Sequence, residues 1–347
     1  MSSPAFVLNV QRNQARVHRF TGVLLAVVCF AAAFARPDYA QDGSNPPAQV
    51  HVVHVQGNVY MIVGAGGNIT LQAGDEGVLL VDTGLASMSD KVIEAVRSIS
   101  DKPIRYIINT HIHQDHTGGN QAIAQQGSTI TGGNVVGNIG ASAGEGATIV
   151  AFQGILDRMS DQGSKDKAPE KAWPTDAYTG PEKKMFFNGE AIEVIHQPSA
   201  HTDGDSIVFF RRSDVVSTGD IFTTTNYPII DLQRGGSIQG IIDGLNRLVY
   251  QITIPAEKQE GGTMVIPGHG RLCDQADVVY YQEMVIIIRD RIQDMIKKGM
   301  TLDEVKESKP TRDYDPLYGS DKGFWTTDMF VSAVYQSLKN QHEKAQK

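Results

Sequence analysis

Short apolar runs alternate with segments of helical spacing along this chain. Val92, Val96 and Ile99 recur at helical spacing and predict a helix over residues 89–99. Strands alternating with helices are typical of a layered α/β protein. Strands are predicted where brief apolar runs end in Gly, Pro or polar residues, at 50–55, 59–63, 78–81, 104–108, 191–196, 215–218 and 264–266.

The last part of the chain is helical in pattern. A long helix is predicted at residues 276–298, with Val285, Ile288 and Ile292 on one face, and a final helix at 327–338. Between them, the capping-box sequence that begins at Thr301 predicts another helix start. We therefore expect a core domain at residues 50–275 and a C-terminal helical extension at 276–347 that packs on the core.

Two internal segments lack the core pattern. Residues 131–147 carry six glycines among small polar residues and are interpreted as either a lid or a surface insertion. Residues 160–184 form a second polar connection, in which Trp173 and Tyr178 are either pocket walls or packing anchors.

The N-terminal segment has the features of an export signal. Arg12, Arg16 and Arg19 precede an uncharged apolar run at 23–35 that ends in Ala33-Phe34-Ala35, which predicts a signal peptide over residues 1–35. An uncleaved anchor is the alternative, although the run is too short to span a bilayer comfortably. A flexible leader is expected at 36–49, because this stretch has no periodicity. We expect a periplasmic or secreted bacterial-type protein with no stable membrane insertion after signal removal.

Composition narrows the class of protein. The 347 residues are 41% apolar and 20% charged, enough for a full hydrophobic core. The net charge of the chain is −8. The charged residues of segment 1–35 are all basic, so its removal would make the protein more negative, which argues against nucleic-acid binding. Cys273 is the one thiol outside the predicted signal peptide and is interpreted as a small buried residue. A small-molecule substrate is the expected partner, and the oligomeric state is left open.

The candidate chemistry begins in one six-residue stretch, His111-Ile112-His113-Gln114-Asp115-His116. Imidazole and carboxylate are the usual ligands of zinc and related cations. Alternate residues of extended chain share a side, so His111 and His113 can hold one ion while Asp115 and His116 reach a second. Three further candidates each follow a predicted strand, namely His201, Asp220 and His269.

Together with Asp82-Thr83-Gly84 after an earlier strand, these motifs resemble the metallo-β-lactamase-fold superfamily, which includes metallo-β-lactamases, glyoxalase II, lactonases and sulfur dioxygenases. The resemblance covers about residues 50–275 and implies a four-layer αβ/βα sandwich. It implies that His111, His113 and His201 bind a first metal, that Asp115, His116 and His269 bind a second, and that Asp220 bridges them. Two zinc ions per chain are expected, with iron or manganese as alternatives.

The resemblance also implies a reaction. We expect a zinc-dependent hydrolase in which a metal-bridging hydroxide, oriented by the catalytic Asp115, attacks the carbonyl of a β-lactam, lactone or thioester. Asp220 stands where one major group of true metallo-β-lactamases has cysteine, so the centre is more similar to those of glyoxalase II and the lactonases. The alternatives are a mononuclear iron sulfur dioxygenase and a non-catalytic metal-binding protein.

Several other polar residues receive supporting roles. Asp82 is interpreted as holding a loop, and His51, His54 and His196 as structural. Asp203 and Asp205 either accept the second ring proton of His201 or form a turn. Residues 223–226 offer neutral hydrogen-bond donors for a substrate, with no lysine beside them in the sequence.

Overall fold

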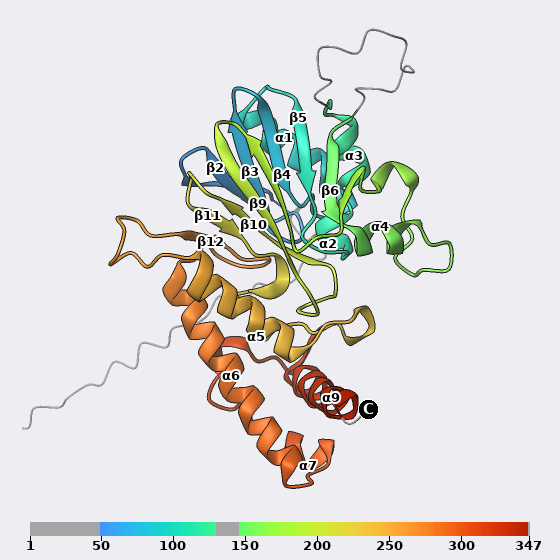
Figure 1. The fold of residues 1–347 in the computed structure, drawn as a ribbon, viewed down its shortest axis with the longest axis vertical. Helices are drawn as coiled ribbons and strands as arrows, with labels where there is room; N and C mark the ends of the chain where they lie inside the picture. Colours follow the sequence, from blue (N-terminus) through green and yellow to red (C-terminus); the bar gives the residue numbers. More distant parts are fainter. Residues whose placement is uncertain (1–48, 130–145, 346–347) are drawn as a thin grey trace, which may run out of the picture. The chain divides into compact units, whose positions relative to one another are not determined.

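The computed structural model describes residues 49–129 and 146–345, which all lie within one unit, Pro46–Lys347. They form two β-sheets with helices on the outer side of each sheet (Figure 1). The strands are β1 (His51–Gln56), β2 (Val59–Val63), β3 (Ile69–Gly74), β4 (Gly77–Val81), β5 (Ile104–Ile108), β6 (Thr148–Phe152), β7 (Asp176–Tyr178), β8 (Glu182–Phe187), β9 (Glu190–Gln197), β10 (Asp205–Phe210), β11 (Val215–Ser217) and β12 (Met264–Ile266). The α-helices are α1 (Ser89–Ile99), α2 (Gln114–Thr117), α3 (Asn120–Gln125), α4 (Gln153–Ser160), α5 (Ile238–Arg247), α6 (Gln275–Lys297), α7 (Leu302–Glu307), α8 (Asp315–Tyr318) and α9 (Thr327–Ala345).

Strand order follows the sequence within each sheet. The first sheet has the order β1-β2-β3-β4-β5-β6-β7, antiparallel from β1 to β4 and parallel from β4 to β7. The second has the order β12-β11-β10-β9-β8, with β11 and β12 parallel and the other pairs antiparallel. Parallel neighbours end at the same edge, so the segments that follow them meet there.

Three apolar layers hold the sheets and helices together. In β4, Leu79 and Val81 face the second sheet, whereas Val78 and Leu80 face α1 and α3, as the two-residue period of a strand requires. The third layer joins the second sheet to α5, α6 and α9. The predicted four-layer sandwich is therefore confirmed, with helices, sheet, sheet and helices in that order.

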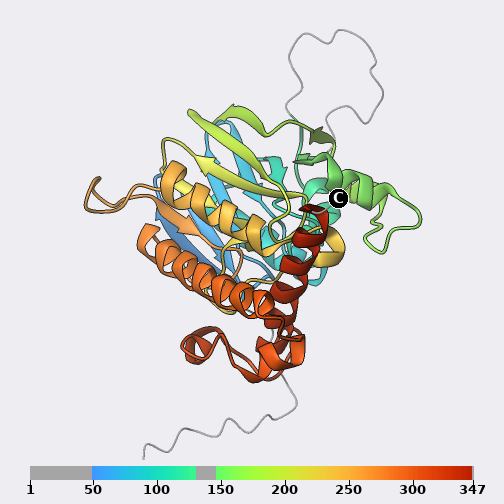
Figure 2. The same cartoon turned by 60° about the horizontal axis from the view of Figure 1, so that its bottom comes forward.

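Of the C-terminal helices, α6 and α9 pack on α5 (Figure 2), and α7 contacts α9. Helix α6 places Val278, Val285, Ile288 and Ile292 in the apolar layer that α5 shares with the second sheet. Helix α7 begins at the capping box of Thr301, whose side chain accepts from the Glu304 backbone N–H. Both helices were predicted from their sequence patterns, and α9 continues beyond the predicted residue 338.

Five of the twelve strands in the described residues were not predicted, namely β3, β6, β7, β8 and β10, and for two of them the reason can be identified. Strand β3 carries Thr70 and Gln72 at fully buried positions, so its apolar pattern is interrupted. Strand β8 is an edge strand whose exposed and half-buried residues alternate, and its first three residues belong to the predicted polar connection at 160–184. The glycine-rich segment largely lies outside the described residues, as do the predicted signal peptide and nearly all of the leader. Within the described residues, no helix is long and apolar enough to cross a membrane.

A buried carboxylate connects the two sheets. Glu190 in β9 accepts from Gln72 Nε2 in β3 at 2.6 Å, from Ser213 Oγ at 2.8 Å, and from the backbone N–H groups of Arg212 and Ser213 at 3.0 Å each. Only 3% of Glu190 is exposed. Four donors therefore depend on one side chain inside the sandwich.

We expect Glu190→Ala to lower the free energy of unfolding by about 2–3 kcal/mol, because it leaves buried donors without acceptors. Urea unfolding measures this loss. Glu193→Ala in the same strand is the control, since its partner Arg211 is exposed and such a pair contributes less than about 1 kcal/mol. Equal midpoints for both variants would contradict the role assigned to Glu190.

Candidate metal centre

The seven candidate ligands come from four segments that each follow a strand. Residues 111–116 follow β5 and continue into α2, and His201 follows β9. Asp220 lies in the 3-10 turn Gly219–Ile221 after β11, and His269 follows β12. The strands end at one side of the sandwich, so residues 158 positions apart in sequence, His111 and His269, meet in one cluster.

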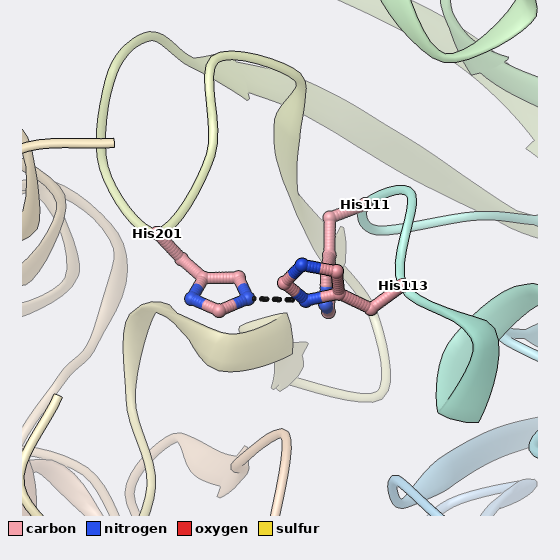
Figure 3. Close-up of side chains that lie close together, drawn as sticks. All are labelled: His111, His113 and His201. Atoms are coloured by element: carbon pink, nitrogen blue, oxygen red, sulfur yellow. Dashed lines mark hydrogen bonds between the residues drawn. The ribbon is translucent and has the colours of Figure 1, made fainter. Parts of the chain in front are cut away.

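The first group is formed by His111, His113 and His201 (Figure 3), whose rings point toward a common point. His113 Nδ1 lies 2.8 Å from His201 Nε2. His111 Nε2 is buried and has no hydrogen-bond partner among the described residues. Three nitrogen atoms therefore converge from three residues, as the resemblance predicts for the first metal.

The second group is formed by Asp115, His116 and His269. His269 Nε2 lies 3.2 Å from Asp115 Oδ2 and 3.4 Å from His116 Nε2. Asp220 lies between the groups, because its Oδ1 is 3.2 Å from His116 Nε2 and its Oδ2 is 3.8 Å from His201 Nε2. All seven predicted residues are thus together, and their roles as ligands stay a prediction.

Hydrogen bonds select which ring nitrogen faces the cluster. His201 Nδ1 donates to the Ile229 carbonyl at 2.6 Å, which leaves Nε2 with its lone pair. His116 Nδ1 lies 2.8 Å from Asp82 Oδ2, and this carboxylate can only accept, so His116 Nε2 is also free to bind. Asp82 belongs to none of the ligand groups, which agrees with its predicted role of holding a loop.

Asp82 also orients His111, through the hydroxyl group of Thr110. Thr110 Oγ1 donates to Asp82 Oδ2 at 2.7 Å, so it must accept from His111 Nδ1 at 3.0 Å. The Thr110 backbone N–H also donates to Asp82 Oδ1 at 2.8 Å. Asp82 therefore determines the orientation of two candidate ligands, His111 and His116.

The histidines of the cluster differ in their charge states. Burial lowers the pKa of His201 to about 4 and that of His111 well below its ordinary value, so both rings are neutral. Burial also opposes the charge on Asp220, but His116 outweighs it and holds the pKa of that carboxyl well below its usual range. Against the effect of burial, nearby carboxylates raise the pKa of His116 well above its ordinary value and that of His269 to about 9, so a metal ion would displace a proton from each of these two rings. Neutral imidazoles and ionised carboxylates are the forms that bind divalent metals. The buried His111 Nε2, which has no hydrogen-bond partner among the described residues, thus fits metal ligation.

Two glycines allow the segments to approach this closely. A Cβ atom on Gly67 would lie 2.3 Å from His116 Cε1, and one on Gly268 would lie 2.0 Å from Asp220 Oδ1. Next to them, Asn68 Nδ2 donates to the carbonyls of Pro267 at 2.9 Å and Gly270 at 3.0 Å, on either side of His269. No local pattern in the sequence indicates these contacts, because the partners of Gly67, Asn68 and Gly268 are distant in the chain.

A cavity of about 1190 Å³ opens on the cluster. Its walls come from the loops of the core and from the C-terminal helical extension, and it includes His113, Asp115, Asp220 and His269. The apolar lining residues are Ile229, Ile230, Leu232, Phe324, Trp325, Met329 and Ala333. Thr225 and Asn226 line it as expected, and the fold also brings Lys306 and Lys322 to this cavity.

The remaining candidates have structural places. Asp205 accepts from the Thr202 backbone N–H and hydroxyl at 2.8 and 2.6 Å, so it forms the turn and does not bond to the His201 ring. Trp173 donates to the Ala168 carbonyl at 2.9 Å, and Tyr178 bonds to Ser206 at 2.7 Å. Neither aromatic residue lines the cavity, which favours the packing interpretation.

Comparison with known proteins gives the following relations. Residues 55–269 match the sequence profile of the Metallo-beta-lactamase superfamily. The chain is 24% identical over 259 residues to the linear primary-alkylsulfatase of Pseudomonas sp. (strain ATCC 19151), a match that covers 67% of this chain and 48% of the relative. The chain therefore spans about half the length of this curated relative.

Solved structures show the same fold. The stereoselective inverting sec-alkylsulfatase from Pseudomonas sp. superimposes with a TM-score of 0.59 at 15% identity, over 83% of this chain and 50% of that chain. The metallo-beta-lactamase from Pontibacter korlensis superimposes with a TM-score of 0.50 at 15% identity, over 69% of this chain and 99% of that one. Nearly all of that second structure is matched, but only 69% of this chain, so this chain adds further elements to the shared fold.

Proposed function

Because this chain belongs to the metallo-beta-lactamase superfamily, we propose that it is a metal-dependent hydrolase of esters that carry a large apolar group, with alkyl sulfates as the first substrate class. The cavity is the observation that carries this proposal, since apolar side chains of the C-terminal extension lie on the same hollow as the His and Asp cluster. The 24% identity to a linear primary-alkylsulfatase supports the choice of sulfate esters.

The cavity separates two chemical environments. The polar end is formed by the candidate ligands, and the wall from α9 and the segment before it is formed by Phe324, Trp325 and Met329. Burial of an alkyl chain contributes about 25 cal/mol per Å² of apolar area removed from water. An amphiphilic ester would thus bind with its apolar part against the extension and its ester group at the cluster.

The proposed reaction adds water across the ester and releases the alcohol and hydrogen sulfate. Divalent metal ions supply Lewis-acid polarisation of the ester and promote deprotonation of water at neutral pH. His111, His113 and His201 would hold one ion, His116 and His269 would help hold the other, and Asp220 would lie between them. Asp115 faces the cavity with its side chain 36% exposed, where it can accept a hydrogen bond from the attacking water.

A carbonyl ester, lactone, thioester or β-lactam is the second candidate. Arg234 is the cation beside His113, and its guanidinium already pairs with Asp166 and Asp231. It therefore has little capacity left to neutralise a sulfate beside His113, whereas an uncharged carbonyl group needs no such partner; Lys306 and Lys322 are the other cations that line the cavity. Zinc as the metal, and the number of ions, belong to the same proposal.

The test is a substrate panel combined with metal analysis. Purified protein is loaded with zinc, its metal content per chain is measured, and it is given dodecyl sulfate, a long-chain p-nitrophenyl ester, a homoserine lactone, a glutathione thioester and a chromogenic cephalosporin. Hydrolysis of dodecyl sulfate that a chelator abolishes and zinc restores would support the proposal. Turnover of the carbonyl substrates alone would favour the second candidate. One bound iron with oxygen consumption would indicate a dioxygenase, and bound metal without turnover a non-catalytic protein.

We expect Phe324→Ala to raise KM for the dodecyl ester about threefold to thirtyfold while changing kcat little, because it removes apolar contact remote from the cluster. Phe324 lines the cavity, whereas Leu317 is also exposed, at 63%, but lies outside this cavity. Leu317→Ala is therefore the matched control. Steady-state kinetics with dodecyl and short-chain esters make the measurement, and a KM increase independent of chain length would contradict the proposed alkyl site.

A further inference from the structure

His113 is contacted at both of its ring nitrogens. Its Nδ1 faces His201 Nε2 inside the cluster, and its Nε2 lies 3.0 Å from Asp231 Oδ2 on the other side. We infer that Asp231 is a positioning residue that keeps the proton of His113 on Nε2 and thereby leaves Nδ1 free to bind metal. This inference rests on the proposed function, because it treats His113 as a ligand.

A second group near the same nitrogen does not change this assignment. Arg234 Nη1 lies 3.4 Å from His113 Nε2, but a guanidinium can only donate. If it donated to Nε2, the proton of a neutral His113 would lie on Nδ1, against His201 Nε2. Asp231 is closer, carries a negative charge and can only accept, and Arg234 Nη1 itself donates to Asp231 Oδ2. The carboxylate therefore determines the tautomer.

Asp231 is held by its own turn. Its Oδ1 accepts from the backbone N–H groups of Gln233 and Arg234, at 3.1 Å each, and so caps the 3-10 turn Leu232–Arg234. Its backbone N–H donates to the His201 carbonyl at 3.0 Å. Since the Ile229 carbonyl accepts from His201 Nδ1, residues 229–234 orient two of the three side chains in the first group.

This turn is fastened to a distant segment by a second carboxylate. Arg234 Nε and Nη2 donate to Asp166 Oδ2 and Oδ1 at 2.9 and 2.5 Å, a bidentate pair with side-chain exposures of only 15% and 9%. Lys165 Nζ adds a bond to Gln233 Oε1 at 2.6 Å. The polar connection after α4 thus supports the first ligand group through Arg234 and Asp231, although no residue of it reaches the cluster.

The chemical consequence of replacing Asp231 follows from its donors and acceptors. An asparagine can keep the turn capped through its oxygen, but its amide NH₂ would then face His113 Nε2. Nε2 would have to accept, so the proton would move to Nδ1 and block its lone pair. Loss of a group that orients a ligating histidine typically weakens metal binding 10- to 100-fold.

The experiment compares Asp231→Asn with Arg158→Gln in the full chain. Arg158 joins α4 to the same region through Asp203 Oδ2 at 2.6 Å and touches no candidate ligand, so it controls for loosening of the segment. Zinc affinity is measured by competition with a chromogenic chelator, the cobalt(II) form is examined by visible absorption, and the Tm of the metal-free protein is recorded.

We expect Asp231→Asn to weaken one zinc site 10- to 100-fold and to alter the cobalt spectrum, with a metal-free Tm close to that of the wild type. Asp166→Asn should change zinc affinity in the same direction by less, and Arg158→Gln should bind zinc as the wild type does.

The contrary outcomes are distinct. Unchanged zinc affinity and cobalt spectrum in Asp231→Asn, with two sites intact in the wild type, would overturn the positioning role and leave the proposed function standing. An equal loss of zinc affinity in Arg158→Gln would assign the effect to loop stability and also overturn it. If the wild type itself bound no divalent metal, the proposed function would fail, and the inference with it.

Discussion

Asp115→Asn is expected to lower kcat by about 10²- to 10⁴-fold while changing metal content much less, because positioned proton transfer contributes an effect of this size. Asp115 Oδ2 lies 3.2 Å from His269 Nε2 and 3.7 Å from His116 Nε2, and the side chain is 36% exposed to the cavity. Asparagine keeps one oxygen for the His269 side but replaces the other with NH₂, which cannot take a proton from water. Turnover of the best panel substrate and metal per chain are measured on the same preparation.

Gln114→Ala is the matched control for this prediction. Gln114 is the neighbouring residue, lines the same cavity and is absent from the ligand groups, so its loss should leave kcat within about threefold of the wild type. Equal losses of metal and of turnover in Asp115→Asn would show that Asp115 only binds metal, and the water-orienting role would then be wrong.

Asp82→Ala is expected to lower the free energy of unfolding by about 3–5 kcal/mol and to weaken metal binding 10- to 100-fold. Asp82 is 2% exposed and accepts from the Thr110 N–H, the Thr110 hydroxyl and His116 Nδ1, at 2.8, 2.7 and 2.8 Å. Alanine would leave three buried donors unpaired. It would also occupy a left-handed backbone position, φ +67°, which disfavours residues other than Gly, Asn and Asp.

Asp82→Asn separates the two effects. Asparagine tolerates the left-handed backbone and can still accept from Thr110, so most of the stability should remain. Its amide would meet His116 Nδ1 with a donor, so metal affinity should still fall. Chemical denaturation of the metal-free protein and zinc competition measure these quantities separately. Wild-type zinc affinity in both variants would refute the orienting role of Asp82.

Much of the fold is local and could be predicted from the sequence. Strands β5 and β12 and helix α1 lie where the apolar period placed them, and α6 is shifted by one residue from the predicted 276–298. In these segments the residues that form the period are also those that enter the core. Strand β3 fails this condition, because its buried Gln72 pairs with Asn188 and Glu190, which lie more than 100 residues later in the chain.

The position of Asp205 illustrates the same limit in the site. The sequence places it four residues after His201, where it can serve either the ring or the turn, and local spacing does not distinguish the two. In the structure, the His201 ring donates its proton to the Ile229 carbonyl, and the Asp205 carboxylate accepts from Thr202. Twenty-eight residues separate His201 from Ile229, so only the packed chain could decide between the alternatives.

The sequence by itself determined the candidate ligand set and the α/β order, because the density of His and Asp in residues 111–116 and the periods of the strands are short-range properties. The tertiary structure alone decided which ring nitrogens are free, how Asp231 and Arg234 support His113, and that the C-terminal extension forms an apolar wall of the cavity. These features depend on contacts between residues far apart in the chain. Such a hydrogen bond or cavity wall forms only when sheets and helices pack together, and it leaves no local pattern in the sequence.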